Sequence, residues 1–253
     1  MLVFLIGLGA GLFGGLVGLG GGAIMIPAMV GILKLSQHEA HGTSLVALVF
    51  TGLAGAGTYA LHGSVDVLAS LLLASTAIFT SGVGARFANT LPEWKLKRSF
   101  GWFLMGISAF LLLKPFLPHA HGMVHGWPQI VALLLTGAFT GFLSGMMGVG
   151  GGGIMVASMV LLLGFPQYTA QGCSLLAMIP IGAAGALTHW RLGNVRKNVL
   201  PALLPGILLG SFLGGSLAHV LPKMDLRIVF VTAILFMGAK YLRTSKPRAE
   251  PAQ

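Results

Sequence analysis

Charged residues are scarce in this chain of 253 residues, where Asp, Glu, Lys and Arg together make up 8%. A soluble domain carries about 25% charged residues, so the composition excludes an ordinary soluble fold. Hydrophobic residues reach 55%, and there are 39 glycines, which membrane helices tolerate better than soluble helices do. The length allows roughly eight helical passes of about 20 residues each. We therefore expect an all-α membrane protein without a sizeable soluble domain.

Cysteine and acidic residues are also rare. The single Cys173 excludes an intrachain disulfide and a CxxC zinc pair. Five acidic residues, which we expect in loops, stand against fifteen Lys and Arg, giving a net charge of +10. Such a balance indicates nucleic acid in a soluble protein, but here the cations separate apolar runs and hold loops in the cytoplasm. We expect no nucleic-acid partner, no cofactor and no metal, since His119, His121 and His125 form only a weak cluster.

The chain repeats itself at a shift of 130 residues without a gap. The aligned pairs include Gly11 with Gly141, Gly15 with Gly145, Gly18 with Gly148, Gly20–Gly22 with Gly150–Gly152, Ser44 with Ser174, and Leu91-Pro92 with Leu221-Pro222. Chance similarity between two apolar segments would not keep glycines and polar residues in one register. We predict a first repeat at 1–114, a connecting loop at 115–128, a second repeat at 129–244 and a disordered tail at 245–253.

Each repeat contains four apolar segments, at 2–33, 42–61, 66–88 and 98–114 and at 129–163, 172–190, 199–221 and 228–243. A leading segment of about 32 residues would reach about 48 Å as one helix, well beyond a hydrocarbon core of about 30 Å. Its glycine cluster stands in the middle. We therefore expect a re-entrant or discontinuous leading helix with two arms too short to span comfortably, followed by three transmembrane helices.

Loop charge tests this topology. If every segment crosses once, Lys and Arg divide eight against seven between the two sides. If each leading segment returns to the side it entered, twelve cations share one side and only Lys114, Lys223 and Arg227 face the other. The positive-inside rule favours the second arrangement. Three crossings per repeat then predict inverted-topology repeats with both termini cytoplasmic, although two full crossings by each leading segment would give the same parity.

The consecutive glycines are the first candidate site. They destabilise a helix by roughly 1 kcal/mol per residue relative to Ala, and the helix that starts after each break presents free N–H groups that favour an anion. The alternative is close helix packing through small residues. Our candidate substrate-binding residues here are Gly20, Gly21, Gly22 and Ala23 in the first repeat and Gly150, Gly151, Gly152 and Gly153 in the second.

A second paired motif follows each break. Thr43-Ser44 aligns with Cys173-Ser174 at the start of the next helix. The hydroxyls can donate to an anion, or they can cap the helix. We include all four residues among the candidate substrate contacts, although a lone Cys is more often a small buried hydrophobe.

Proton coupling, if present, needs a titratable group, and no carboxylate relay is apparent within the apolar segments. His41 and His189 are the candidates because His titrates near neutrality. For His189, which stands beside Trp190 and Arg191, the favoured alternative is an interfacial anchor.

The doubled Gly-x-Gly-Gly-Gly motif, the Gly-Thr-Ser-Leu motif and the four-segment repeat resemble the TauE/SafE (TSUP, sulfite exporter) family over nearly the whole chain. The second copy departs from the pattern, with Ala157 in place of Pro and Cys173 in place of Thr. The resemblance implies a secondary transporter, generally an exporter, of sulfite, organosulfonates or similar sulfur anions in the bacterial inner membrane. Its expected partners are that anion, the lipid bilayer, protons and a second copy of the chain in a homodimer.

Two other functions are compatible with the sequence. An anion channel could use the same paired helix ends. An intramembrane serine hydrolase would need a dyad such as Ser144 with His189, but Ser144 aligns with Gly14 on a predicted packing face, which disfavours this reading.

Overall fold

The computed structural model describes residues 1–113 and 126–220, together with 235, 238–239 and 242–243. Its helical content is 83%, and the described residues form no strand, so the all-α class is confirmed. The helices are α1 (Leu2–Val17), α2 (Gly22–Gly31), α3 (Gln37–Leu61), α4 (Val67–Thr90), α5 (Glu93–Leu113), α6 (Trp127–Met147), α7 (Gly152–Leu161), α8 (Gln167–Arg191), the short 3-10 helix η1 (Lys197–Val199) and α9 (Leu200–Ala218). Most of the apolar segment at 228–243, most of the loop at 115–128 and the tail at 245–253 lie outside the described residues.

Within the described ranges, five helical stretches are long and apolar enough to cross a membrane: α3, α4, α6, α8 and Lys197–Ala218, which joins η1 to α9. The chain is therefore a multi-pass membrane protein. We expected both arms of each leading segment to be too short to span. This is wrong for α6, which has 21 residues and a length of about 31 Å, enough to cross the hydrocarbon core. Its counterpart α1 has 16 residues and reaches only about 24 Å.

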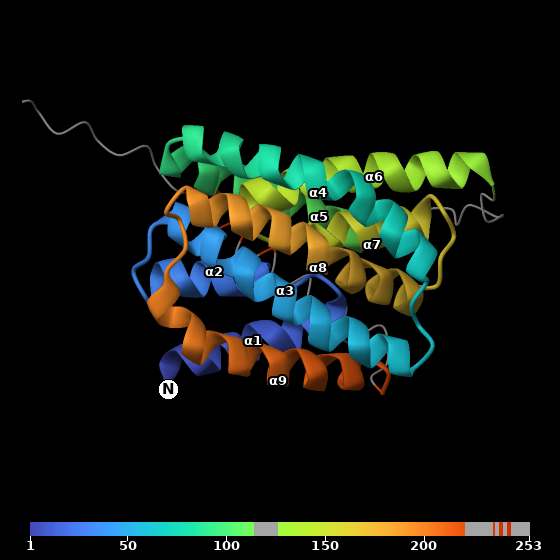
Figure 1. The fold of residues 1–253 in the computed structure, drawn as a ribbon, viewed down its shortest axis with the longest axis horizontal. Helices are drawn as coiled ribbons and strands as arrows, with labels where there is room; N and C mark the ends of the chain where they lie inside the picture. Colours follow the sequence, from blue (N-terminus) through green and yellow to red (C-terminus); the bar gives the residue numbers. More distant parts are fainter. Residues whose placement is uncertain (114–125, 221–234, 236–237, 240–241, 244–253) are drawn as a thin grey trace, which may run out of the picture.

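Each leading segment turns at its glycines. After α1 the chain adopts left-handed backbone at Gly18, Gly20 and Gly21, and α2 runs back toward the end of the bundle where α1 begins (Figure 1). A Cβ on Gly21 would meet the carbonyl oxygen of Ala10, so the returning chain lies directly on α1. The second segment repeats this geometry between α6 and α7, where a Cβ on Gly151 would lie 2.8 Å from the Thr140 carbonyl oxygen.

The leading helices pack against the opposite repeat. A Cβ added to each of Gly7, Gly11 and Gly15 of α1 would meet, in turn, the carbonyl oxygens of Leu203, Ile207 and Ser211 of α9. The same holds between α6 and α4, for Gly137, Gly141 and Gly145 against Leu73, Ala77 and Ser81. Both members of each pair advance together along the chain, so the packed helices are parallel. Glycine every fourth residue allows this close backbone approach, and the two repeats interlock.

Helices α3 and α8 pack against each other, antiparallel, in the middle of the bundle (Figure 1). A Cβ on Gly52 would lie 2.8 Å from the Leu175 carbonyl oxygen, and one on Gly182 would lie 3.2 Å from that of Leu45. Leu45 and Leu175 differ by 130, as do Gly52 and Gly182, so the contacts between the two repeats are reciprocal.

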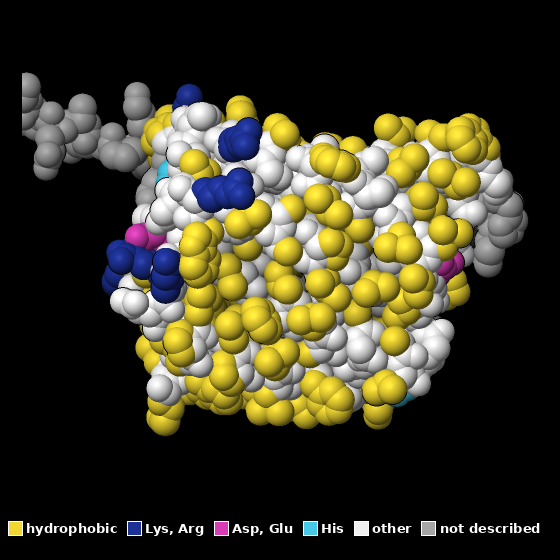
Figure 2. Space-filling view, viewed as in Figure 1, with side chains coloured by type: hydrophobic (Ala, Val, Ile, Leu, Met, Phe, Trp, Pro, Cys, Tyr) yellow, Lys and Arg dark blue, Asp and Glu magenta, His cyan; other side chains and the backbone are white. Residues whose placement is uncertain are grey.

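Lys and Arg side chains gather at one end of the bundle, which lies on the left in Figures 1 and 2. The N-terminus, the end of α4 and the end of α8 lie at this end (Figure 1). The face in Figure 2 between the two ends is largely hydrophobic, as a lipid-facing surface is. The prediction that all acidic residues lie in loops is wrong for Glu39, in the first turn of α3, and for Glu93, the first residue of α5. Asp66 lies just outside a helix, as expected, and caps the N-terminus of α4.

Candidate functional site

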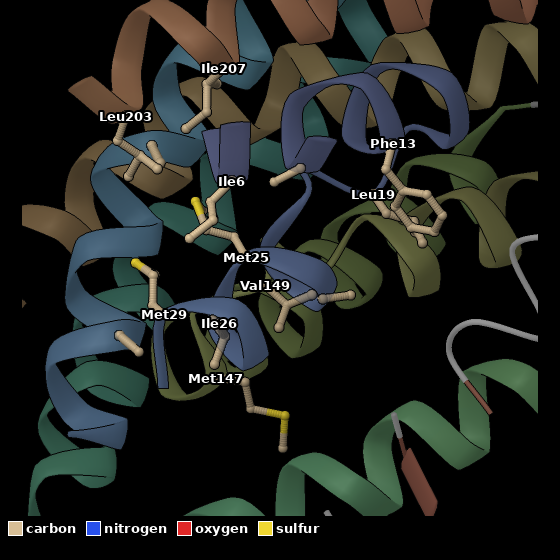
Figure 3. Packing of buried hydrophobic residues seen from close by; sticks show 14 of the residues in the cluster. Ile6, Phe13, Leu19, Met25, Ile26, Met29, Met147, Val149, Leu203 and Ile207 are labelled. Carbon is tan, nitrogen blue, oxygen red and sulfur yellow. The ribbon is translucent and has the colours of Figure 1, made fainter. Parts of the chain in front are cut away.

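The two glycine turns contact each other inside the bundle. A Cβ on Gly22 would lie 2.7 Å from the Gly148 carbonyl oxygen, and one on Gly152 would meet the carbonyl oxygen of Gly18. In Figure 3, Val149 of the second turn lies close to Ile26 of α2. The structure therefore brings together the two glycine runs predicted to bind the substrate, although they are 130 residues apart.

Both turns present buried backbone N–H groups at the start of a helix. Gly21 and Gly151 are the N-caps of α2 and α7, and both have left-handed backbone. The described residues provide no hydrogen-bond acceptor for the N–H groups of Gly20–Ala23 or of Gly150–Gly153, all of which are buried. Buried N–H groups without an acceptor are rare in proteins. Clustered at a helix N-terminus, they form an arrangement that binds anions.

Leu48 of α3 and Met178 of α8 pack against both glycine turns. Their positions differ by 130, and both side chains are fully buried. A Cβ on Gly150 would lie 2.6 Å from Leu48 Cδ1 and 3.1 Å from Met178 Sδ, and one on Gly20 would lie 2.9 Å from the same sulfur. In this conformation the two apolar side chains, from α3 and α8, cover the glycine turns.

Ser44 and Ser174 hold the helix ends of the opposite repeat. The Ser44 hydroxyl lies 2.7 Å from the Gly148 carbonyl oxygen, and the Ser174 hydroxyl lies 2.7 Å from that of Gly18. Each hydroxyl also approaches a carbonyl in its own helix at 2.8 Å. A serine has one proton to donate, so a carbonyl takes it here. Donation to an anion stays a prediction, which requires these hydroxyls to rotate.

Thr43 and Cys173, two of the predicted substrate contacts, hydrogen-bond to loop backbone in this conformation. The Thr43 hydroxyl accepts a hydrogen bond from the backbone N–H of Arg196 at 3.0 Å. The Cys173 sulfur lies 3.2 Å from the backbone nitrogen and 3.3 Å from the carbonyl oxygen of Asp66. Arg196 and Asp66 are themselves equivalent positions, so the two contacts are counterparts that secure the loops before α9 and α4.

His41 and His189 both bind the carbonyl end of α6. His41 Nδ1 lies 3.0 Å from the Met146 carbonyl oxygen, and His189 Nε2 lies 3.0 Å from that of Gly145. As carbonyls only accept, each of these ring nitrogens carries the proton. Both side chains are fully buried, so the favoured reading of His189 as an interfacial anchor is wrong.

The carbonyl end of α1 is bound by different side chains at the equivalent positions. Gln171, the counterpart of His41, donates from Nε2 to the Val17 carbonyl oxygen at 3.1 Å. Tyr59, the counterpart of His189, places its hydroxyl 3.4 Å from the Leu16 carbonyl oxygen and 3.2 Å from Gln171 Oε1, and it donates its one proton to these acceptors. Side chains at equivalent positions therefore bind the carbonyl ends of both helices, but two imidazoles bind α6 where an amide and a phenol bind α1.

Ser144 is a buried polar residue that was not among the expected site residues. Its hydroxyl makes no hydrogen bond within the described part of the chain. A Cβ at the equivalent Gly14 would lie 2.6 Å from the Gly21 nitrogen, so by the repeat Ser144 borders the second turn. The signal in the sequence was a hydroxyl where the other repeat has glycine. No bond joins Ser144 to His189, and no described contact forms the hydrolase dyad.

Comparisons with known proteins agree on one family. A sequence profile described as Sulfite exporter TauE/SafE matches residues 3–241. The chain is 28% identical over 217 residues to the probable membrane transporter protein YunE of Bacillus subtilis, covering 77% of this chain and 80% of the relative. It is 24% identical over 235 residues to YdhB of the same organism, also a probable membrane transporter protein, covering 92% and 96%. No solved structure matches.

Proposed function

Because the chain belongs to the TauE/SafE family of membrane transporters, we propose that it is a secondary transporter that exports a small sulfur-containing anion, such as sulfite or an organosulfonate, by alternating access. The observation that carries this proposal is the pair of buried, acceptor-free N–H clusters at Gly20–Ala23 and Gly150–Gly153. The anion class follows the family description, and the N–H clusters supply the chemistry that binds it.

The proposed site lies between the starts of α2 and α7. An oxyanion there accepts hydrogen bonds from the two N–H clusters, and the positive ends of two helix dipoles stabilise its charge. Neither glycine run contains Lys or Arg, so the site binds the anion reversibly without a fixed ion pair. Ser144 adds one hydroxyl beside the second turn, and the Ser44 and Ser174 hydroxyls join when they leave the helix carbonyls.

Leu48 and Met178 lie against both turns in this conformation and occupy the space that an anion would need, so binding requires α3 and α8 to shift. We place that movement between two interlocked units, α1 with α9 and α6 with α4. Inverted repeats provide two equivalent openings on opposite sides of a midplane site. In this proposal the cation-rich end, where the N-terminus lies, faces the cytoplasm of a bacterial inner membrane and concentrates anions at the entrance. The loop charges predict the same side for the C-terminus.

Counterflow in proteoliposomes tests the function. Purified protein is reconstituted in vesicles loaded with sulfite, thiosulfate, sulfoacetate or malonate, the last being the dicarboxylate analogue of sulfoacetate. Uptake of the same radiolabelled anion is then measured. A transporter of sulfur anions gives saturable uptake, accelerated by internal sulfite, thiosulfate or sulfoacetate and not by malonate.

The other outcomes separate the alternatives. Uptake that rises linearly with concentration and is not accelerated by internal anion indicates a channel. Equal acceleration by malonate contradicts selectivity for sulfur. If none of the four anions moves faster than in protein-free vesicles, the proposed function is wrong.

A further inference from the structure

The chemical difference between the two helix ends points to a coupling site. We propose, resting on the transport function above, that His41 and His189 form a proton-binding site at the carbonyl end of α6, and that one proton bound there is exchanged with each transport cycle. The equivalent end of α1 carries Gln171 and Tyr59, which do not titrate near neutral pH. At these two equivalent positions, therefore, the end of α6 carries titratable side chains near neutral pH and the end of α1 does not, although the His219 ring packs on Tyr59 there.

Each imidazole has a second partner that accommodates a proton. Gln37 Nε2 lies 2.7 Å from His41 Nε2, and Asn194 Nδ2 lies 3.4 Å from His189 Nδ1. In the neutral state the amide donates to the ring nitrogen. Rotation of the amide by half a turn presents its oxygen, which accepts from a protonated nitrogen. Either ring can thus gain a proton while keeping its bond to α6.

The electrostatic surroundings limit the pair to one proton. Burial disfavours a charge on either ring, and the carbonyl end of the helix, which stabilises a cation, offsets part of that cost for one proton. The ionisable groups that act on His41 are His189 and His38, and His38 also acts on His189. Glu39, on the same helix as His41, is ion-paired with Arg196 at 2.8 Å and is therefore already neutralised. Two imidazolium rings on one helix end would repel each other.

The site is directly connected to the second glycine turn. His41 binds Met146, and one helical turn later Ser44 binds Gly148, so α3 holds both sides of the point where α6 ends. Both rings are fully buried here, so a proton from water reaches them only when this end opens. The rings therefore take up the proton in one conformation of α3 and the end of α6, and release it in another. The proton enters from the water on one side of the membrane and leaves into the water on the other side.

A variant that copies the other repeat tests this inference. The double variant His41→Gln, His189→Tyr gives α6 the side chains that bind α1. Proteoliposomes containing the pH dye pyranine are assayed for proton movement during net thiosulfate transport, since thiosulfate has no titrating proton near neutral pH. Counterflow exchange, which needs no net driving force, is measured in parallel. We expect the double variant to keep exchange and to lose thiosulfate-driven proton movement to the level of protein-free vesicles.

The matched control is His62→Gln, because His62 is an exposed histidine that stacks on His219 away from α6. It should retain both exchange and proton movement. Proton movement equal to wild type in a double variant that exchanges thiosulfate overturns the inference. If the double variant does not fold, the wild-type protein still tests the inference. Thiosulfate transport by wild type without proton movement overturns the proton site and leaves the proposed function intact. A wild type that exchanges none of the tested anions overturns both.

Discussion

The hydroxyl of Ser44 donates to the carbonyl oxygen of Gly148 across 104 positions of sequence, and it does so at 2.7 Å inside the bundle. Its counterpart Ser174 makes the same bond to Gly18. Each serine thus fixes the point at which the leading helix of the other repeat ends.

Removing either hydroxyl should destabilise the fold. Ser44→Ala leaves the Gly148 carbonyl without this donor, and an unsatisfied buried acceptor costs about 1–3 kcal/mol. We expect Ser44→Ala and Ser174→Ala to lower the free energy of unfolding by similar amounts, measured by SDS titration in mixed micelles. Ser75→Ala is the control, because the Ser75 hydroxyl is exposed and binds its own helix. Equal stability of all three variants would contradict the role of these bonds.

The glycine turns should not tolerate a side chain. Gly21→Val and Gly151→Val place a branched carbon against Ala10 and Thr140 and in left-handed backbone, which costs about 1–2 kcal/mol before any clash. We expect anion binding, read as a thermal shift with sulfite or thiosulfate, to be lost while the protein still inserts. Gly193→Val controls for the cost of placing valine in left-handed backbone, because Gly193 has the same conformation with open space around it. Unchanged affinity in both turn variants would exclude the proposed site.

Leu48 and Met178 should control what fits between the turns. The double variant Leu48→Ala, Met178→Ala removes both side chains that close the site. We expect the ratio of sulfoacetate to sulfite exchange to rise, because the larger anion gains room. Leu73→Ala, which empties a fully buried position on α4, costs a comparable 2–5 kcal/mol in stability and should leave the ratio unchanged. If the exchange ratio also rises in Leu73→Ala, the effect comes from the loss of stability and not from the size of the site.

Ser144 should contribute to anion affinity. Ser144→Gly reproduces the residue of the first repeat without filling the space, and loss of one hydrogen bond to a charged group weakens binding by about 1.5–3 kcal/mol. Titration of the purified variant with thiosulfate measures the dissociation constant directly. An affinity equal to wild type would leave Ser144 with a packing role only.

Much of the architecture was predictable because composition and repeated glycines can be read without knowing the tertiary contacts. The scarcity of charge predicted membrane helices, and the repeat at 130 residues predicted paired elements. The length of α6 was missed because helix ends depend on where glycine backbone becomes left-handed, which the apolar pattern does not show.

The partners of the site residues could not be predicted. Thr43 and Ser44 are neighbours in sequence, yet one binds the loop before α9 and the other binds the end of α6, because successive positions on a helix point in different directions. His189 looked interfacial by its place near a helix end, but the packing of α6 against it buries the ring.

The sequence alone determined that this protein is helical, membrane-embedded and doubled, and that glycine runs interrupt its leading segments, because these follow from the cost of burying charge and the poor helix propensity of glycine. Only the tertiary structure decided that the two turns meet, that each leading helix packs on the opposite repeat, and that one helix end carries histidines where the other carries glutamine and tyrosine. Those relationships depend on contacts between residues more than 100 positions apart, and packing of the folded chain is what brings them together.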